Sequence, residues 1–91
     1  MRSIDIASFC EGGIIREEAF RKKVDQFDWE QYRGKRVLIQ GCASIPIPTW
    51  AYMMVTARLA KVAGSINYGE VTAPLPIYTA ANPNTSKESS N

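Results

Sequence analysis

Residues 35–68 read KRVLIQGCASIPIPTWAYMMVTARLAKVAGSINY and decide the fold. They begin with an apolar run at residues 37–39, which is typical of a strand at the centre of a sheet that is covered on both faces. They end with residues 65–68, which we expect to form a second strand. A strand, a crossover helix and a strand within about thirty residues make a βαβ unit with a right-handed crossover. The sequence therefore predicts an α/β fold, with a small sheet, a central βαβ unit and helices packed on it.

Between these two strands we expect an extended loop and then a helix. The loop, residues 43–48, contains two prolines, and each forces the residue before it into an extended conformation. Thr49 is then the expected N-cap of a helix that continues to about Ala63, where Gly64 ends it. The helix is apolar on nearly every side, and its polar exceptions are Thr56, Arg58 and Lys61. Because one sheet face cannot cover such a helix, it needs a second covering surface.

The N-terminal part predicts a short strand followed by a helix. Ile4 and Ile6 alternate with smaller or polar residues, as in a half-buried strand. From Arg16 onward, acidic residues precede basic ones, which the helix dipole favours. Apolar residues three or four positions apart then form one stripe: Phe20, Val24 and Phe27. This stripe is expected to face the core.

The segment before the central strand is expected to form a separate short turn. Asp28 and Gln31 are spaced as an N-cap and its reciprocal partner, which places the turn at residues 29–32. Gly34 can take the left-handed conformation that ends such a turn.

The chain divides into one domain, residues 1–78, and a tail, residues 79–91. At the end of the domain, residues 73–78 (APLPIY) must be extended, and their prolines confine them to a sheet edge or a packed arm. The tail reads TAANPNTSKESSN and has no large apolar residue that could offset the entropy of ordering it, so we expect it to be disordered.

Charge and cysteine content narrow the class of protein. Eleven basic and nine acidic residues leave a net charge of +2 with both signs intermixed, which argues against a nucleic-acid partner. The sequence shows no signal peptide or membrane span, so we expect no membrane partner. Two cysteines are too few for a secreted disulfide scaffold. These features indicate a cytoplasmic protein.

Three stretches of the chain carry a family resemblance: FDWEQYRGKRVLIQGC (residues 27–42), PTWAYMMVTARLAKVAGSINYGE (residues 48–70) and PLPIY (residues 74–78). Over about residues 11–78 the chain resembles the bacterial family called domain of unknown function 2480. The resemblance implies no activity and no catalytic residues, because none is established for the family. Members are about twice as long and contain two copies of one unit, the first with PTWAY and the second ending in PIY. This chain has both marks in one copy and resembles a half-length form.

The resemblance and the apolar helix together predict a homodimer. If the long form packs its two copies against each other, a single copy can cover the same surface by pairing with itself about a two-fold axis. The helix at residues 49–63 independently requires such a partner. We therefore expect dimerisation to complete the α/β fold.

The loop after the central strand, residues 41–50, is the candidate ligand site. It lies where the carboxyl end of a strand meets a helix N-terminus, the position at which open α/β sheets bind ligands. Backbone N–H groups of Thr49 and Trp50 and the hydroxyls of Ser44 and Thr49 could hold a carboxylate or phosphate, beside Cys42. An ordinary N-cap and tight turn explain the same residues, because the loop has no Lys, Arg or glycine-rich fingerprint. We expect a non-enzymatic module that binds a small anionic ligand or a protein partner here.

Cys42 offers a second interpretation, as the thiol of a redox protein or an enzyme. Its place before a helix would favour the thiolate. The chain has no His, however, so it cannot supply a Cys–His or Ser–His pair. A Cys that ends a buried strand is most often a small core residue.

A third interpretation concerns metals. Cys10 and Cys42 from two copies would supply four thiolates, enough for zinc or an iron–sulfur cluster. The cysteine spacing predicts no metal site, and support comes only from the resemblance, whose members are associated with iron–sulfur assembly genes. The carboxylates Glu11, Asp28 and Glu70 show no pairing typical of acid–base catalysis. The sequence identifies no cofactor.

Overall fold

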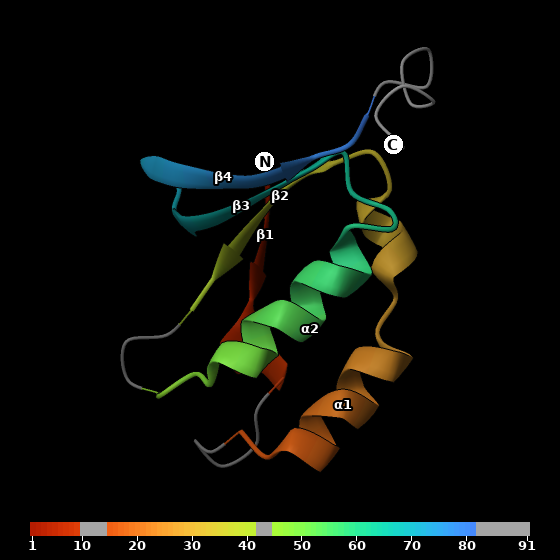
Figure 1. Cartoon of the computed structure of the whole chain (residues 1–91), viewed down its shortest axis with the longest axis vertical. Helices are drawn as coiled ribbons and strands as arrows, with labels where there is room; N and C mark the ends of the chain where they lie inside the picture. Colours follow the sequence, from red (N-terminus) through yellow and green to blue (C-terminus); the bar gives the residue numbers. More distant parts are fainter. Residues whose placement is uncertain (10–14, 42–44, 82–91) are drawn as a thin grey trace.

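Four strands form one mixed sheet in the computed structural model of the chain, which describes residues 1–9, 15–41 and 45–81. They are β1 (Arg2–Asp5), β2 (Arg36–Gln40), β3 (Ser65–Glu70) and β4 (Ala73–Thr79), and they lie side by side in chain order (Figure 1). The first three are parallel, and β4 is antiparallel to β3. The predicted α/β fold is confirmed, and β2 lies between two parallel neighbours, as its apolar run indicated.

Both α-helices pack on the same face of this sheet (Figure 1). Helix α1 (Glu17–Gln26) joins β1 to β2, and α2 (Thr49–Leu59) joins β2 to β3. Two short 3-10 helices, η1 (Ile6–Phe9) and η2 (Trp29–Tyr32), follow β1 and precede β2. Because β1 also pairs in parallel with β2, the chain contains two consecutive βαβ units where the sequence predicted one.

Alternation along the strands decides which side chains join the core. Val37 and Ile39 of β2 and Ile66 of β3 point towards the helices and are buried among helix side chains. Leu38 points to the opposite face, where its register neighbours are Ser3 and Asn67. It is also fully buried. The central strand is therefore buried on both faces, as expected, although both helices lie on one of them.

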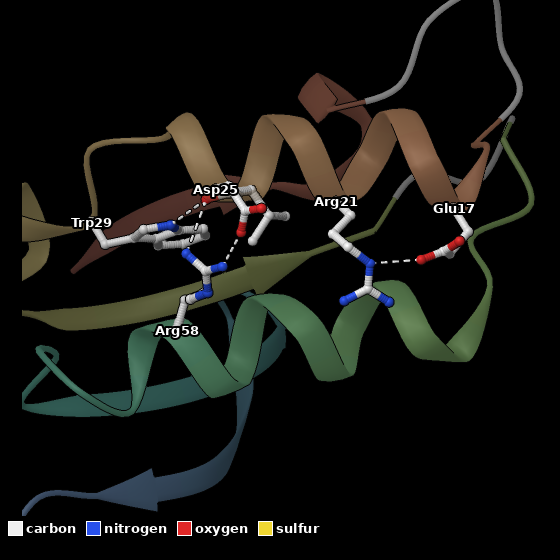
Figure 2. Close-up of polar contacts among 6 residues, drawn as sticks. Glu17, Arg21, Asp25, Trp29 and Arg58 are labelled. Atoms are coloured by element: carbon white, nitrogen blue, oxygen red, sulfur yellow. Dashed lines mark hydrogen bonds and ion pairs between the residues drawn. The ribbon is translucent and has the colours of Figure 1, made fainter.

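The C-terminal end of α1 is held by side chains from two other elements (Figure 2). The carbonyl of Val24 accepts a 2.8 Å hydrogen bond from Trp29 Nε1, because the chain leaves the helix before a backbone N–H can reach it. The Arg58 guanidinium of α2 also reaches this carbonyl, at 3.4 Å, and pairs with the Asp25 carboxylate. These contacts fix α1 against α2.

Helix α2 is covered on two sides within the chain. Its Ala51, Val55 and Leu59 side chains are buried against the sheet, and Trp50 meets Phe20 of α1 edge to face at 5.5 Å. The second covering surface that the apolar sequence required is thus supplied in part by α1. Met53 remains 66% exposed, so one strip of the helix is still uncovered.

The boundaries of α2 differ from those predicted. Thr49 is the first helical residue, not the N-cap, because the extended backbone of Pro48 occupies the cap position without a side-chain hydrogen bond. The helix ends at Leu59 instead of about Ala63. After Leu59 the chain tightens, since the N–H groups of residues 61 and 62 donate to carbonyls three residues back.

Two further local predictions were wrong in detail. Asp28 does not cap η2 with its side chain; instead Gln31 Nε2 donates to the Asp28 carbonyl at 2.8 Å. The separate turn at residues 29–32 is nevertheless confirmed, as is the left-handed Gly34, whose φ is 72°. Ile6 belongs to η1 and not to the first strand, because the Asp5 carboxylate accepts a hydrogen bond from the N–H of Ala7 and turns the chain.

The proline-rich segment at residues 73–78 forms the edge strand β4, as predicted. This strand includes Thr79, and the N–H of Ala80 donates to the Gly64 carbonyl at 2.8 Å. The rest of the expected tail, residues 82–91, lies outside the described residues. In the part of the chain that the structure describes, no helix has the length and apolar composition needed to cross a bilayer.

Candidate functional site

A hollow of about 470 Å³ opens at the edge of the sheet where the three parallel strands end. Asp5 ends β1, Gln40 ends β2 and is followed by Gly41, and Gly69 and Glu70 end β3. Tyr52 of α2 and Tyr68 of β3 complete the described lining. Since the carboxyl edge of parallel strands is where open α/β sheets bind ligands, this hollow is the candidate site.

Two tyrosines form one wall of the hollow. The rings of Tyr52 and Tyr68 lie at 90° with their centroids 5.3 Å apart, an edge-to-face contact between α2 and β3. Burial, helped by a side-chain hydrogen bond with Tyr68, raises the pKa of Tyr52 to about 12. The Tyr52 hydroxyl therefore stays protonated at neutral pH and acts as a hydrogen-bonding group.

Gly41 makes room for this tyrosine. A Cβ atom at position 41 would overlap the Tyr52 hydroxyl oxygen and would lie 3.3 Å from its Cζ atom. The end of β2 and the first turns of α2 thus meet through a glycine backbone and a phenol. Any larger residue at position 41 would push the Tyr52 side chain out of its place.

The charge of the hollow comes from two carboxylates. Asp5 and Glu70 are both exposed to solvent, and Asp5 Oδ1 accepts a 2.9 Å hydrogen bond from the N–H of Ala7. Neither Lys nor Arg is among the described residues that line the hollow. The site therefore presents negative charge beside two aromatic rings.

An apolar groove of about 230 Å³ adjoins the hollow. Its described lining consists of Ile39, Tyr52, Thr56, Tyr68 and Ile77, so it runs between α2 and the strands β2, β3 and β4. Tyr52 and Tyr68 line both spaces. These two rings therefore form a wall that the groove and the hollow share.

Comparison with known families matches this chain to one of them. The family described as "Protein of unknown function (DUF2480)" matches residues 1–57 and, in a second match, residues 30–80. The chain belongs to the DUF2480 family. The two matches share residues 30–57 of this DUF2480 domain. No curated protein and no solved structure matched the chain.

Of the site residues expected from the sequence, the structure describes Thr49 and Trp50. Thr49 is exposed at the start of α2, and Trp50 packs on Phe20; neither lines the hollow. Cys42 and Ser44 lie outside the described residues, and so does Cys10. The redox and cluster interpretations, which depend on these cysteines, therefore stay predictions. Among the residues that are described, no three His, Cys, Asp or Glu side chains form a group that could hold a metal ion.

The hollow lies at the edge of the DUF2480 sheet that the sequence reasoning selected, but the carboxylates that line it were not selected. Asp5 and Glu70 are 65 positions apart and line one hollow because β1 and β3 flank β2 in the same direction. The expected strands gave no signal for either residue, because Asp5 lies within the alternation of Ile4 and Ile6 and the expected second strand ends at Tyr68, before Glu70. The aromatic residues Tyr52 and Tyr68 could line a ligand pocket on the sequence alone, but aromatics at helical and strand spacing are more often core or interface residues.

Proposed function

We propose that this DUF2480 domain is a non-enzymatic binding module that holds a small organic cation, an ammonium or guanidinium compound, in the hollow at the carboxyl edge of its sheet. The observation that carries the proposal is the combination of two carboxylates and two tyrosine rings around one space. Carboxylates form short, charge-assisted hydrogen bonds with such cations, and aromatic faces attract them further.

The same lining argues against the small anion that the sequence suggested. An anion in the hollow would face Asp5 and Glu70 without a described Lys or Arg to offset them. Both carboxylates would repel an anion in the hollow, whereas both would attract a cation. The neutral Tyr52 hydroxyl supports binding over proton transfer, because its raised pKa keeps it from acting as a base near neutral pH.

We further propose that the protein is bacterial and cytoplasmic and that it forms a homodimer. Two separate family matches that share residues 30–57 are what a family with two related units would produce. A chain with one such unit reaches the same arrangement by pairing two copies.

Titration with agmatine, which carries a guanidinium at one end and an amine at the other, tests the ligand. The wild-type protein should bind agmatine more tightly than phosphate or acetate, and binding should weaken as salt is added. Glu70→Gln removes one carboxylate. Asp5→Asn removes the other but keeps an oxygen for the N–H of Ala7. Each variant should lose about tenfold or more in affinity, as for a lost hydrogen bond to a charged group.

Glu18→Gln is the matched control, because it changes the net charge equally on the exposed surface of α1. It should bind agmatine as the wild type does. Equal affinity in all four proteins, or phosphate binding tighter than agmatine binding, would refute the cation site.

A further inference from the structure

An apolar strip remains uncovered beside the groove. We define it as Met53 of α2, Tyr68 of β3, and Leu75, Ile77 and Tyr78 of β4, which are 66%, 40%, 58%, 49% and 39% exposed. In Figure 1, α2 lies between α1 and the pair of strands β3 and β4. Helix α1 therefore covers the side of α2 that faces away from β4. Tyr68 and Leu75 are register partners, Ile77 lines the groove, and Met53 follows Tyr52 of the groove along α2. Exposed apolar side chains on adjoining elements mark an interaction surface.

The strip lies on the face of the sheet that carries the helices. Leu75 is the register partner of Tyr68, and Tyr78 is the partner of Ile66, whose side chain is in the core. Ile77 lines the groove against α2. A shift in register next to Ile66 leaves Ile77 without a partner, which is how a β-bulge brings an extra side chain to one face.

We infer that a second copy of this chain packs on the apolar strip and closes the apolar side of the ligand hollow. The second half of this inference rests on the function proposed above. Tyr52 and Tyr68 separate the groove from the hollow, so a copy seated on the strip would hold both rings in place. Dimerisation and cation binding are therefore coupled, and each strengthens the other.

The family matches favour a second copy over another partner. Residues 30–57, which are matched twice, include β2 and the first nine residues of α2, the helix that borders the strip. In a family with two such units, each unit has a related unit to pack against. A chain with a single unit can instead pack against a second copy of itself about a two-fold axis.

The chain's own tail does not suit the strip. Residues 82–91 read NPNTSKESSN and contain no large apolar side chain. Such a segment cannot replace the water on an apolar surface with apolar contacts. The tail is therefore a poorer occupant than Met53, Leu75 and Ile77 of another copy.

The edge of β4 directs the copies to pack through side chains. Pro74 and Pro76 have no backbone N–H, and prolines in an edge strand face away from its neighbour. A strand added at this edge would lack two donors. Pairing of the β4 edges of two copies into one continuous sheet is thus disfavoured. Contact through the side chains of the apolar strip is the arrangement that we favour instead.

The exposed side chains of the strip are suited to the centre of a dimer interface. A standard interface covers about 800 Å² on each partner, roughly an eighth of the 5972 Å² that this chain exposes. Five large side chains, each between 39% and 66% exposed, supply the apolar centre of such an interface.

Light scattering at micromolar concentration tests the interface. The wild type should have about twice the chain mass of 10.1 kDa. Met53→Glu places a charge at the most exposed position of the strip, on a helix that tolerates Glu, and should give a folded monomer. Leu75→Glu should do the same from β4. Gln26→Glu adds the same charge at an exposed position of α1 and should remain dimeric.

Three results would overturn the interface. They are a monomeric wild type, strip variants that remain dimeric, or a dimer that forms only after residues 82–91 are deleted. The last result would identify the tail as the occupant.

Agmatine titration of the same proteins tests the coupling. Both strip variants should bind agmatine less tightly than the wild type, and agmatine should strengthen the wild-type dimer. A wild-type dimer that binds no agmatine would refute the proposed function while leaving the interface intact. Monomeric variants that bind agmatine as tightly as the wild type would refute only the coupling.

Discussion

Gly64 and Gly34 provide a direct test of how closely the chain packs at the end of the sheet opposite the hollow. A Cβ atom added to Gly64 would lie 2.9 Å from the carbonyl oxygen and 3.1 Å from the carbonyl carbon of Gly34. The backbones cannot easily move apart, because Gly34 N–H donates to Val62 O and Gly64 N–H donates to Lys35 O, both at 2.8 Å. Gly64→Ala must therefore strain the backbone or break these bonds.

The expected cost follows from two opposing effects. Overpacking of this kind costs about 1–3 kcal/mol, and the loss of chain entropy in the unfolded Ala variant returns about 0.4–1 kcal/mol. We expect a net loss of about 1–2 kcal/mol in the free energy of unfolding. For a domain of this size, that lowers the melting temperature by about 5–15 °C. Thermal and urea unfolding should be measured at one fixed protein concentration, because dimerisation makes apparent stability depend on it.

Asn substitutions distinguish two reasons why replacing a glycine lowers stability: a steric clash at Gly64 and an unfavourable backbone conformation at Gly34. Gly34 has a φ of 72° and nothing within 4 Å of an added Cβ, so only its left-handed backbone is at issue. Because Asn adopts that conformation more readily than Ala, Gly34→Asn should be more stable than Gly34→Ala. Gly64→Asn should be no better than Gly64→Ala. A Gly64→Ala variant as stable as the wild type, or one that is rescued by Asn, would refute the reasoning.

Four further results are expected. Trp29→Phe removes the hydrogen bond to the Val24 carbonyl and should lower the free energy of unfolding by about 1–3 kcal/mol in urea titrations, so an unchanged midpoint would contradict that role. The raised pKa of Tyr52 means that its contribution to stability is complete below about pH 10 and is lost as the pH rises towards 12; Tyr52→Phe should show a shallower decline of melting temperature over that range, and a parallel decline would count against it. Deletion of residues 82–91 should leave the melting temperature unchanged, and a drop of several degrees would show that the tail packs. Cys42 should react with an alkylating reagent no faster than a free thiol at neutral pH, because no cationic residue adjoins it in the sequence; faster reaction would favour the redox interpretation.

Most of the fold could be read from local patterns. The apolar run at residues 37–39, the prolines at 74 and 76, and the left-handed Gly34 each have one plausible structural role, and the structure confirms all three. These features act over a few residues, so their energetic preference is present in the sequence alone. Helix ends were less predictable: the end of α2 at Leu59 depends on the tightened turn that brings Gly64 against Gly34.

The candidate site could be located from the sequence, but its chemistry could not be specified. That ligands bind at the carboxyl ends of parallel strands follows from the βαβ pattern alone, and the hollow lies there. Which side chains line it depends on strand order and direction, which bring Asp5 beside the ends of β2 and β3, so that Asp5 and Glu70 line one hollow. The uncovered strip likewise arises from the register shift in β4 and from the side of α2 that α1 covers. Local sequence determined the elements because short-range preferences suffice for them, whereas the site and the strip depend on contacts between distant segments that only the packed sheet brings together.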